Sequence, residues 1–234
     1  MSYPQPVLWN TAQSVHLACE HLRTLGPRWQ ALLSNIGECQ HQTHPHREPY
    51  EALMRAVAYQ QLTTRAGDAM IRRLLEAFSP DSQTFPSAQQ IAVSEKDALR
   101  KCGFSTRKAE TLHAIAHGAL QGLVPAREQA LTMDDNTLIE RLCTLKGIGR
   151  WTVEMYLIYG LERMDIMPLD DLGIRLGLCY LHQRDTIPSR RELAELSLPC
   201  QPFRTVAAWY LWRSPTMPDY ADFKSRLKTS NRKG

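Results

Sequence analysis

Residues 142–176 read LCTLKGIGRWTVEMYLIYGLERMDIMPLDDLGIRL. A Gly-Ile-Gly turn at residues 147–149 lies between two segments whose apolar residues recur at helical spacing. A short loop follows the second segment and ends in two carboxylates, Asp170 and Asp171, at the start of another apolar run. We therefore expect a helix, a tight glycine hairpin, a second helix, and an acidic residue at the start of a third.

The hairpin has the chemistry of a phosphate site. Backbone N–H groups at a helix N-terminus point outward from such a turn and bind phosphates without reading the bases. Glycine at positions 147 and 149 would keep side chains from holding the backbone away from the anion. The alternative is an ordinary connection between two helices with a solvated cap, and the Gly-x-Gly pattern on its own favours that alternative.

Composition places the chain among soluble globular proteins, since 43% of its 234 residues are hydrophobic and 22% are charged. A formal net charge of +4 fits a polyanionic partner without requiring one. No apolar run approaches the ~20 residues of a membrane span, and no signal-peptide pattern opens the chain. We expect a cytoplasmic protein without a membrane partner.

Neither the cysteines nor the histidines form a metal-binding pattern. The six cysteines are scattered, without a C-x-x-C pair or histidines at zinc spacing, so we expect buried, reduced thiols. Residues 40–47, QHQTHPHR, contain three histidines. We interpret this run as a polar loop in preference to a metal site.

Helical spacing continues along the chain, and no segment alternates long enough to predict a sheet. Residues 8–35 predict two helices broken at Gly26-Pro27. In the helix that Ser105 would cap, Arg107 and Lys108 occupy the first turn, where cations oppose the helix dipole. These two either lie on a solvated face, which we favour, or hold a phosphate. The expected fold class is all-α.

The stretch at 142–176 resembles the helix-hairpin-helix signature of the HhH-GPD DNA glycosylase superfamily, which ends in a Gly/Pro loop and an aspartate. The residues that carry the resemblance are Leu142, Leu145, Gly147, Ile148, Gly149, Thr152, Pro168 and Asp171. Segments 55–66, 99–112 and 202–212 extend it and are most similar to the alkylated-base branch, 3-methyladenine DNA glycosylase II.

This resemblance implies two helical lobes with an active-site cleft between them. The first lobe would comprise residues 48–165 and end in the helix-hairpin-helix. The second would combine residues 1–47 with residues 166–234 and carry the catalytic aspartate.

The resemblance also implies an activity in base excision repair. A monofunctional DNA glycosylase of this branch flips an N3- or N7-alkylated purine out of the duplex, hydrolyses the N-glycosidic bond and leaves an abasic site. Asp171 matches the catalytic aspartate, whose charge would meet the positive charge that develops on the sugar. Asp170 is expected to cap the helix, and without the resemblance both acids would be interpreted as caps. Relatives that also cleave the strand have a lysine at the position of Trp151.

Aromatic residues would form the base pocket. Trp151 and Trp212 match pocket aromatics of the alkylation branch, with Tyr156 as a further candidate, and such rings attract cationic bases. Tyr59 and Trp209 are assigned to packing, because aromatic residues at helical spacing are more often core residues.

Further matched positions concern the DNA. Gln61, with Leu62 beside it, matches the plug that fills the gap left by the extruded base; two polar residues ending a helix is an alternative of nearly equal weight. The amides of Gly147 and Gly149, with the hydroxyl of Thr152, would hold a phosphate.

The ligands implied by the resemblance are few. The backbone carbonyls of Cys143, Leu145 and Ile148 match those that bind a structural Na⁺ or K⁺. No catalytic cofactor is expected, and no iron–sulfur cluster, because four closely spaced cysteines are missing. The expected partner is double-stranded DNA containing alkylated bases, bound by a monomer. Rival interpretations are a non-catalytic helix-hairpin-helix protein that binds DNA or lesions, and a glycosylase for other damaged or mispaired bases.

Overall fold

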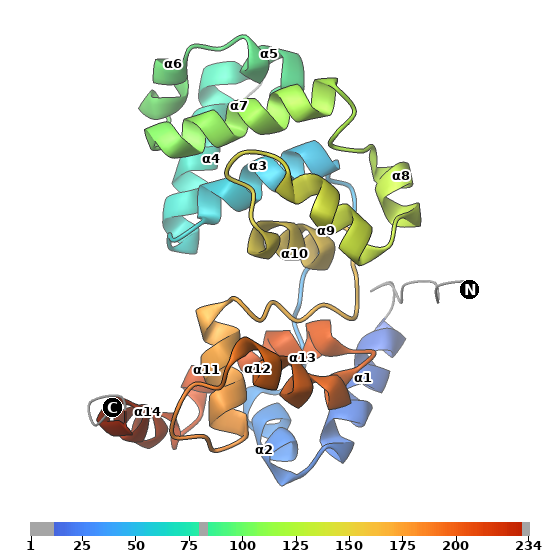
Figure 1. Ribbon diagram of the computed structural model, residues 1–234, viewed down its shortest axis with the longest axis vertical. Coiled ribbons are helices and arrows are strands. Elements are labelled where there is room, and N and C mark those ends of the chain that lie inside the picture. Colours follow the sequence, from blue (N-terminus) through green and yellow to red (C-terminus); the bar gives the residue numbers. More distant parts are fainter. Residues whose placement is uncertain (1–11, 80–83, 231–234) are drawn as a thin grey trace. The chain divides into compact units, whose positions relative to one another are not determined.

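A computed structural model describes residues 12–79 and 84–230. Within these ranges every regular element is helical, with fourteen α-helices, two short 3-10 helices and no strand (Figure 1). The expected all-α fold class is confirmed. Among the described helices, none combines the length and the apolarity that a membrane span requires.

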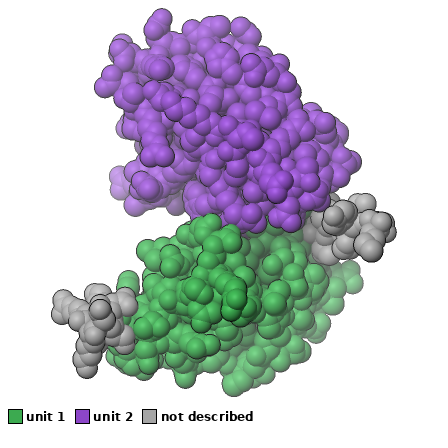
Figure 2. Space-filling view, viewed as in Figure 1, with its two compact units in different colours: residues 1–43, 162–234 green, residues 44–161 purple. Residues whose placement is uncertain are grey.

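The chain divides into two compact units (Figure 2). Unit 2 runs from His44 to Leu161, and unit 1 joins the chain up to Thr43 with everything from Glu162 onward. The two boundaries between the units, at 43/44 and 161/162, each lie four residues before the expected borders at 47/48 and 165/166. Hydrogen bonds explain the difference: the Thr43 hydroxyl donates to the Glu162 carboxylate at 2.7 Å, and the His44 amide donates to the Tyr159 carbonyl at 2.7 Å.

Unit 2 contains eight helices, α3 to α10. Their bounds are α3 (Pro49–Tyr59), α4 (Thr64–Phe78), α5 (Ala88–Ala92), α6 (Lys96–Lys101), α7 (Thr106–Leu120), α8 (Arg127–Thr132), α9 (Asp135–Cys143) and α10 (Arg150–Tyr159). Helix α3 packs against α4, α7 and α10, and α7 also packs against α5 (Figure 1). Buried side chains such as Leu53 and Val57 on α3, and Leu112 and Ile115 on α7, fill the space between them.

Side-chain caps fix where α4, α5, α7 and α9 of unit 2 begin, and Ser87 caps α5. Thr63, Ser105 and Asp134 each accept a backbone amide three residues later, at the starts of α4, α7 and α9. A cap of this kind contributes ~1 kcal/mol. Together they determine where the α3–α4 turn ends and where the helix leading into the glycine hairpin begins.

Unit 1 is built from both ends of the chain. Its α-helices are α1 (Ala12–Thr24), α2 (Pro27–Ile36), α11 (Leu172–Leu181), α12 (Arg190–Ser197), α13 (Arg204–Leu211) and α14 (Tyr220–Ser230), and its 3-10 helices are η1 (Leu198–Cys200) and η2 (Ser214–Thr216). The break between α1 and α2 falls at Gly26-Pro27, as the sequence predicts; the expected start at residue 8 lies outside the described residues. Helix α13 packs against α1, α2 and α11, and Trp209 lies in this core, as expected.

All six cysteines are free thiols, four of them buried and two half-buried. The histidine-containing run at 40–47 is irregular in structure. In the part of the chain that the structure describes, no group of three histidine, cysteine, aspartate or glutamate side chains could hold a metal ion.

Candidate functional site

The two hairpin glycines have different structural roles. Gly147 has a φ of +84°, and a Cβ there would lie 1.9 Å from the hydroxyl oxygen of Thr111 on α7. Only glycine fits both the backbone angle and the space. Gly149, the N-cap residue of α10, has a φ of −103° and open space where a Cβ would lie. The protein's own packing therefore requires Gly147, whereas Gly149 leaves the helix N-terminus open to an anion.

The backbone amides of this hairpin suit a phosphate. Over residues 12–79 and 84–230, no protein group accepts the amides of Gly147, Gly149 or Arg150. Amides left unpaired at a helix N-terminus are the donors that bind anions. The Thr152 hydroxyl is placed differently: the residue is 2% exposed, and its Oγ1 accepts a hydrogen bond from Gln60 Nε2 at 2.9 Å. Its expected contact with a phosphate stays a prediction.

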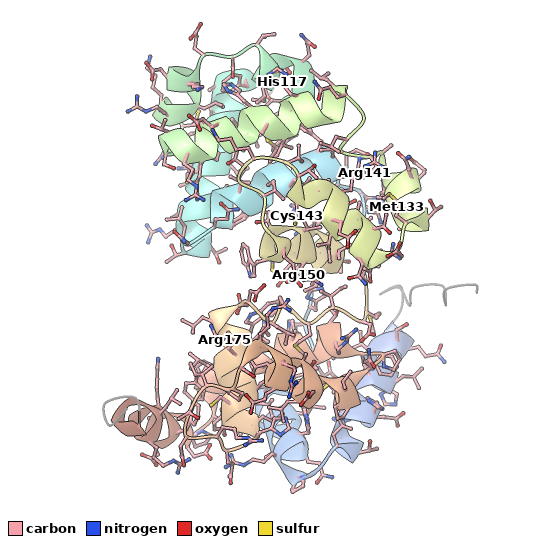
Figure 3. All side chains as sticks on the ribbon, in the orientation of Figure 1. His117, Met133, Arg141, Cys143, Arg150 and Arg175 are labelled. Carbon is pink, nitrogen blue, oxygen red and sulfur yellow. The ribbon has the colours of Figure 1, made fainter. Side chains whose placement is uncertain are left out.

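Two of the three hairpin carbonyls expected to bind a cation accept no hydrogen bond from the described residues. Cys143, labelled in Figure 3, ends α9, and the turn follows it. The Leu145 carbonyl accepts the Ile148 amide at 3.1 Å, while no donor among the described residues reaches the carbonyls of Cys143 and Ile148. Oxygen ligands suit hard cations. These carbonyls could therefore serve as ligands of the Na⁺ or K⁺ that the family resemblance implies.

The plug candidates lie in the turn between α3 and α4. Gln61 has a φ of +56°, the left-handed region that a non-glycine residue enters at a cost of roughly 1–2 kcal/mol. Its side chain is exposed, and Leu62 is 46% exposed. Strained residues that face solvent cluster at functional sites. The turn therefore offers an accessible polar side chain and an accessible apolar one.

Helix α4 adds a basic surface next to this turn. A hollow there is lined by Arg65, Asp68, Ala69 and Arg72. Asp68 accepts a hydrogen bond from the Tyr59 hydroxyl at 2.5 Å, whereas no partner of Arg65 occurs within the described residues. The Tyr59 ring packs where a Cβ on Gly67 would lie, in line with its expected packing role. No sequence pattern singled out these arginines, because their spacing is that of an ordinary solvated helix face.

Lys108 is not on a solvated face, so that expectation is wrong. Its Nζ donates to the carbonyls of Ala58 and Gln60, at 3.0 Å each. These carbonyls lie at the C-terminal end of α3, where backbone acceptors lack helical partners. Burial lowers the pKa of the Lys108 ammonium from its usual value. Arg107, its neighbour, is exposed as expected.

In unit 1, Asp171 is the N-cap residue of α11. Its Oδ1 accepts the Ile174 amide at 3.0 Å and the indole N–H of Trp212 at 2.9 Å. Gly173 makes room for this arrangement, since a Cβ there would lie 2.9 Å from Trp212 Cδ1 and 3.0 Å from Asp171 Oδ1. The two hydrogen bonds fix the orientation of the carboxylate and of the indole together.

The expectation that Asp170 caps this helix is wrong. Asp171 provides the cap, and Asp170 is exposed and accepts a hydrogen bond from Arg190 Nε at 3.0 Å. Two consecutive aspartates before one apolar run cannot be told apart by pattern, because both are good caps.

The three expected pocket aromatics differ in accessibility. Trp151, in the first turn of α10, and Trp212, which follows α13, are half-buried and keep surface that a ligand can reach. Tyr156 is 2% exposed, and its ring lies 2.7 Å from the position of a Cβ on Gly160. The burial of Tyr156 favours a packing role over the expected contact with a base.

Comparisons with known proteins identify the family of this chain. The family described as HhH-GPD superfamily base excision DNA repair protein matches residues 54–202. DNA-3-methyladenine glycosylase 1 of Schizosaccharomyces pombe is 44% identical over 201 residues, which cover 86% of this chain and 87% of that protein. The alkylbase DNA glycosidase-like protein mag2 of the same organism is 35% identical and aligns over 85% of this chain and 92% of its own.

A solved structure is similar over most of its length. The S. pombe 3-methyladenine DNA glycosylase Mag1, in complex with abasic DNA, matches with a TM-score of 0.80 and 43% identity, over 87% of this chain and 98% of that one. The family match covers more than half of the chain, and the aligned relatives cover most of it. The chain belongs to the HhH-GPD superfamily of base excision DNA repair proteins.

Proposed function

We propose that this protein is a monofunctional DNA glycosylase that hydrolyses the N-glycosidic bond of alkylated purines in double-stranded DNA and leaves an abasic site. The observation that carries the proposal is the carboxylate of Asp171, oriented at the start of α11 by the Ile174 amide and the Trp212 indole. The match to DNA-3-methyladenine glycosylase 1 of S. pombe over most of the chain supports the same activity.

The chemistry follows from charge. When an N-glycosidic bond breaks, positive charge develops at the anomeric carbon, and a fixed carboxylate stabilises it. The same carboxylate can orient a water molecule for attack, as in glycoside hydrolysis. Trp151 has no amine to form a Schiff base with the sugar, so water is the nucleophile and the strand stays intact.

The substrate class follows from the aromatic residues. N3- and N7-alkylated purines are cationic, and an aromatic ring face attracts cations. Because such bases are already good leaving groups, the site needs no strong general acid. The Trp212 N–H donates to Asp171, and the half-buried ring keeps some surface for the base.

DNA binding is assigned to unit 2. The open amides at Gly149 and Arg150 would bind a phosphate of the damaged strand, and a cation on the Cys143 and Ile148 carbonyls would reinforce this contact. Gln61 and Leu62 would enter the space that the extruded base leaves.

The proposal is tested with methylated duplex DNA. The protein should release free 7-methylguanine and 3-methyladenine, identified by chromatography, and an end-labelled strand should break only after alkali treatment. Binding to abasic DNA without release of any base would identify a non-catalytic binding protein instead. Breakage before alkali treatment would overturn monofunctionality.

Gly173→Ala is expected to slow excision by about tenfold, because the added methyl overlaps both Trp212 and the carboxylate oxygen of Asp171. Single-turnover excision rates measure this effect, and binding to abasic DNA should stay near that of the unaltered protein. An unchanged excision rate would show that the contact between Trp212 and Asp171 does not matter for catalysis.

Arg65→Ala is expected to weaken DNA binding at every sequence and to reduce the slope of log K against log salt by about 0.9, the value for one phosphate contact. Fluorescence anisotropy at several salt concentrations measures the slope. Arg191, whose side chain is 88% exposed on α12, is the matched control, and Arg191→Ala should leave the slope unchanged. If the slope for Arg65→Ala equals that of Arg191→Ala and of the unaltered protein, Arg65 does not contact a DNA phosphate.

A further inference from the structure

Two side chains from other helices of unit 2 hold the turn that carries Gln61. From α7, Lys108 Nζ donates to the carbonyls of Ala58 and Gln60 at 3.0 Å each. From α10, Thr152 Oγ1 accepts the side-chain amide of Gln60 at 2.9 Å. Directly after these contacts the backbone turns left-handed at Gln61. Gln60, the residue before the plug candidates, is thus held at its backbone carbonyl by Lys108 and at its side chain by Thr152.

The end of helix α3 needs this support. Helices commonly end with a glycine in the left-handed conformation, but here the left-handed residue is Gln61, which has a Cβ. Two carbonyls that converge on one point need a compact group with several donors, and an ammonium has three N–H donors on one atom. Lys108 supplies that group: its side chain is half-buried and its Nζ donates to both carbonyls.

The same face of α7 also supports the glycine hairpin. Thr111, one turn after Lys108, lies against Gly147 so closely that no Cβ fits between them. Residues three apart on a helix share a face. One face of α7 therefore contacts both the turn that carries Gln61 and the glycine hairpin, and links the two within unit 2.

The geometry points to Lys108 as a positioning residue for base extrusion. It holds the Gln60–Leu62 turn in register with the hairpin, so that the plug enters the duplex one fixed distance from the phosphate that the hairpin binds. Extrusion costs a few kcal/mol of lost stacking and pairing. If the plug turn is already ordered before binding, the entropy cost of ordering it does not add to that free energy. The inference rests on the proposed function. It assigns Lys108 no direct contact with phosphate, because its ammonium already binds two carbonyls.

The test compares excision of 7-methylguanine paired with cytosine and placed opposite an abasic site, where little pairing has to be broken. Lys108→Met should slow single-turnover excision about tenfold in the paired duplex, from the loss of hydrogen bonds to a charged group, and much less opposite the abasic site. Lys101→Met, at an exposed position on α6, removes the same charge and should change neither rate. Equal losses on both duplexes, or no loss on either, would overturn the inference.

A second variant keeps the test independent of the folding of Lys108→Met. Gln60→Leu removes the hydrogen bond between Gln60 and Thr152 and leaves Lys108 in place. It should slow excision in the paired duplex more than opposite the abasic site, as Lys108→Met does. Lys108→Arg keeps the charge and several donors, and it should restore part of the rate in the paired duplex. A uniform loss for Gln60→Leu, together with no restoration by arginine, would contradict a positioning role.

A binding readout separates this inference from the proposed function. With 2-aminopurine beside the lesion, fluorescence rises when the neighbouring base leaves the stack, whether or not a base is then cut. The unaltered protein should produce a rapid rise and Lys108→Met a slower or smaller one. If the protein releases no base but the two fluorescence signals differ, the proposed function is wrong and the role of Lys108 stands. If the signals are equal and both proteins excise the base at the same rate, the role of Lys108 is wrong and the proposed function stands.

Discussion

Asp171→Asn is expected to lower the rate of base excision on the order of 10³-fold, the loss seen when a main source of transition-state charge stabilisation is removed. Asparagine keeps a side-chain oxygen that can accept both the Ile174 amide and the Trp212 indole N–H, and it is as good an N-cap as aspartate. The substitution therefore removes the negative charge and little else. Single-turnover excision of 7-methylguanine measures the rate.

The neighbouring aspartate provides the control. Asp170→Asn makes the same chemical change one residue earlier, at an exposed position whose partner is Arg190, and should leave the excision rate unchanged. Binding of Asp171→Asn to abasic DNA should match that of the unaltered protein. Excision at the normal rate would move the catalytic role to another residue, and loss of abasic-DNA binding would show that residue 171 acts mainly on the fold.

Gly147→Ala is expected to destabilise the protein by roughly 2–5 kcal/mol, the sum of a left-handed alanine and an overpacked contact. The backbone angle is +84°, and the new methyl would lie 1.9 Å from Thr111 Oγ1. A chain of this size should then melt at least ~4 °C lower. Thermal denaturation followed by circular dichroism measures the shift, and Thr111→Ala in the same chain should recover part of it.

The second hairpin glycine separates stability from DNA binding. Gly149→Ala adds a methyl into open space at an ordinary backbone angle, so the melting temperature should fall much less than for Gly147→Ala, by no more than the loss of a favourable N-cap residue. The same methyl lies where a phosphate would approach the amides, and DNA affinity should fall. If Gly149→Ala binds DNA normally, the phosphate does not approach this glycine; if Gly147→Ala melts normally, the hairpin can shift away from α7.

Local patterns predicted much of this molecule because local physics determines it. Apolar spacing predicted helices throughout, Gly26-Pro27 marked the break between α1 and α2, and the Gly-Ile-Gly turn falls between α9 and α10. The sequence also placed an aspartate at the start of α11, since a carboxylate before an apolar run is a helix start signal.

Contacts between distant segments could not be read in this way. Lys108 binds the Gln60 carbonyl 48 residues away, and the Trp212 indole reaches Asp171 across 41 residues. Helical periodicity says which face a residue occupies but not which element covers that face. Sequence patterns therefore led us to assign Lys108 to solvent and the helix cap to Asp170, and both assignments are wrong.

The discontinuity of unit 1 has a consequence for how the protein is made. Cys19 contacts Tyr210, 191 residues later, and His21 binds the carbonyl of Pro199, 178 residues later. At about 5–20 residues per second, a ribosome releases the partners of α1 and α2 only roughly ten to forty seconds after those helices emerge. Until α11 and α13 are synthesised, the nascent chain exposes Trp29 and the other apolar core residues of α1 and α2. This is the surface that a chaperone would bind.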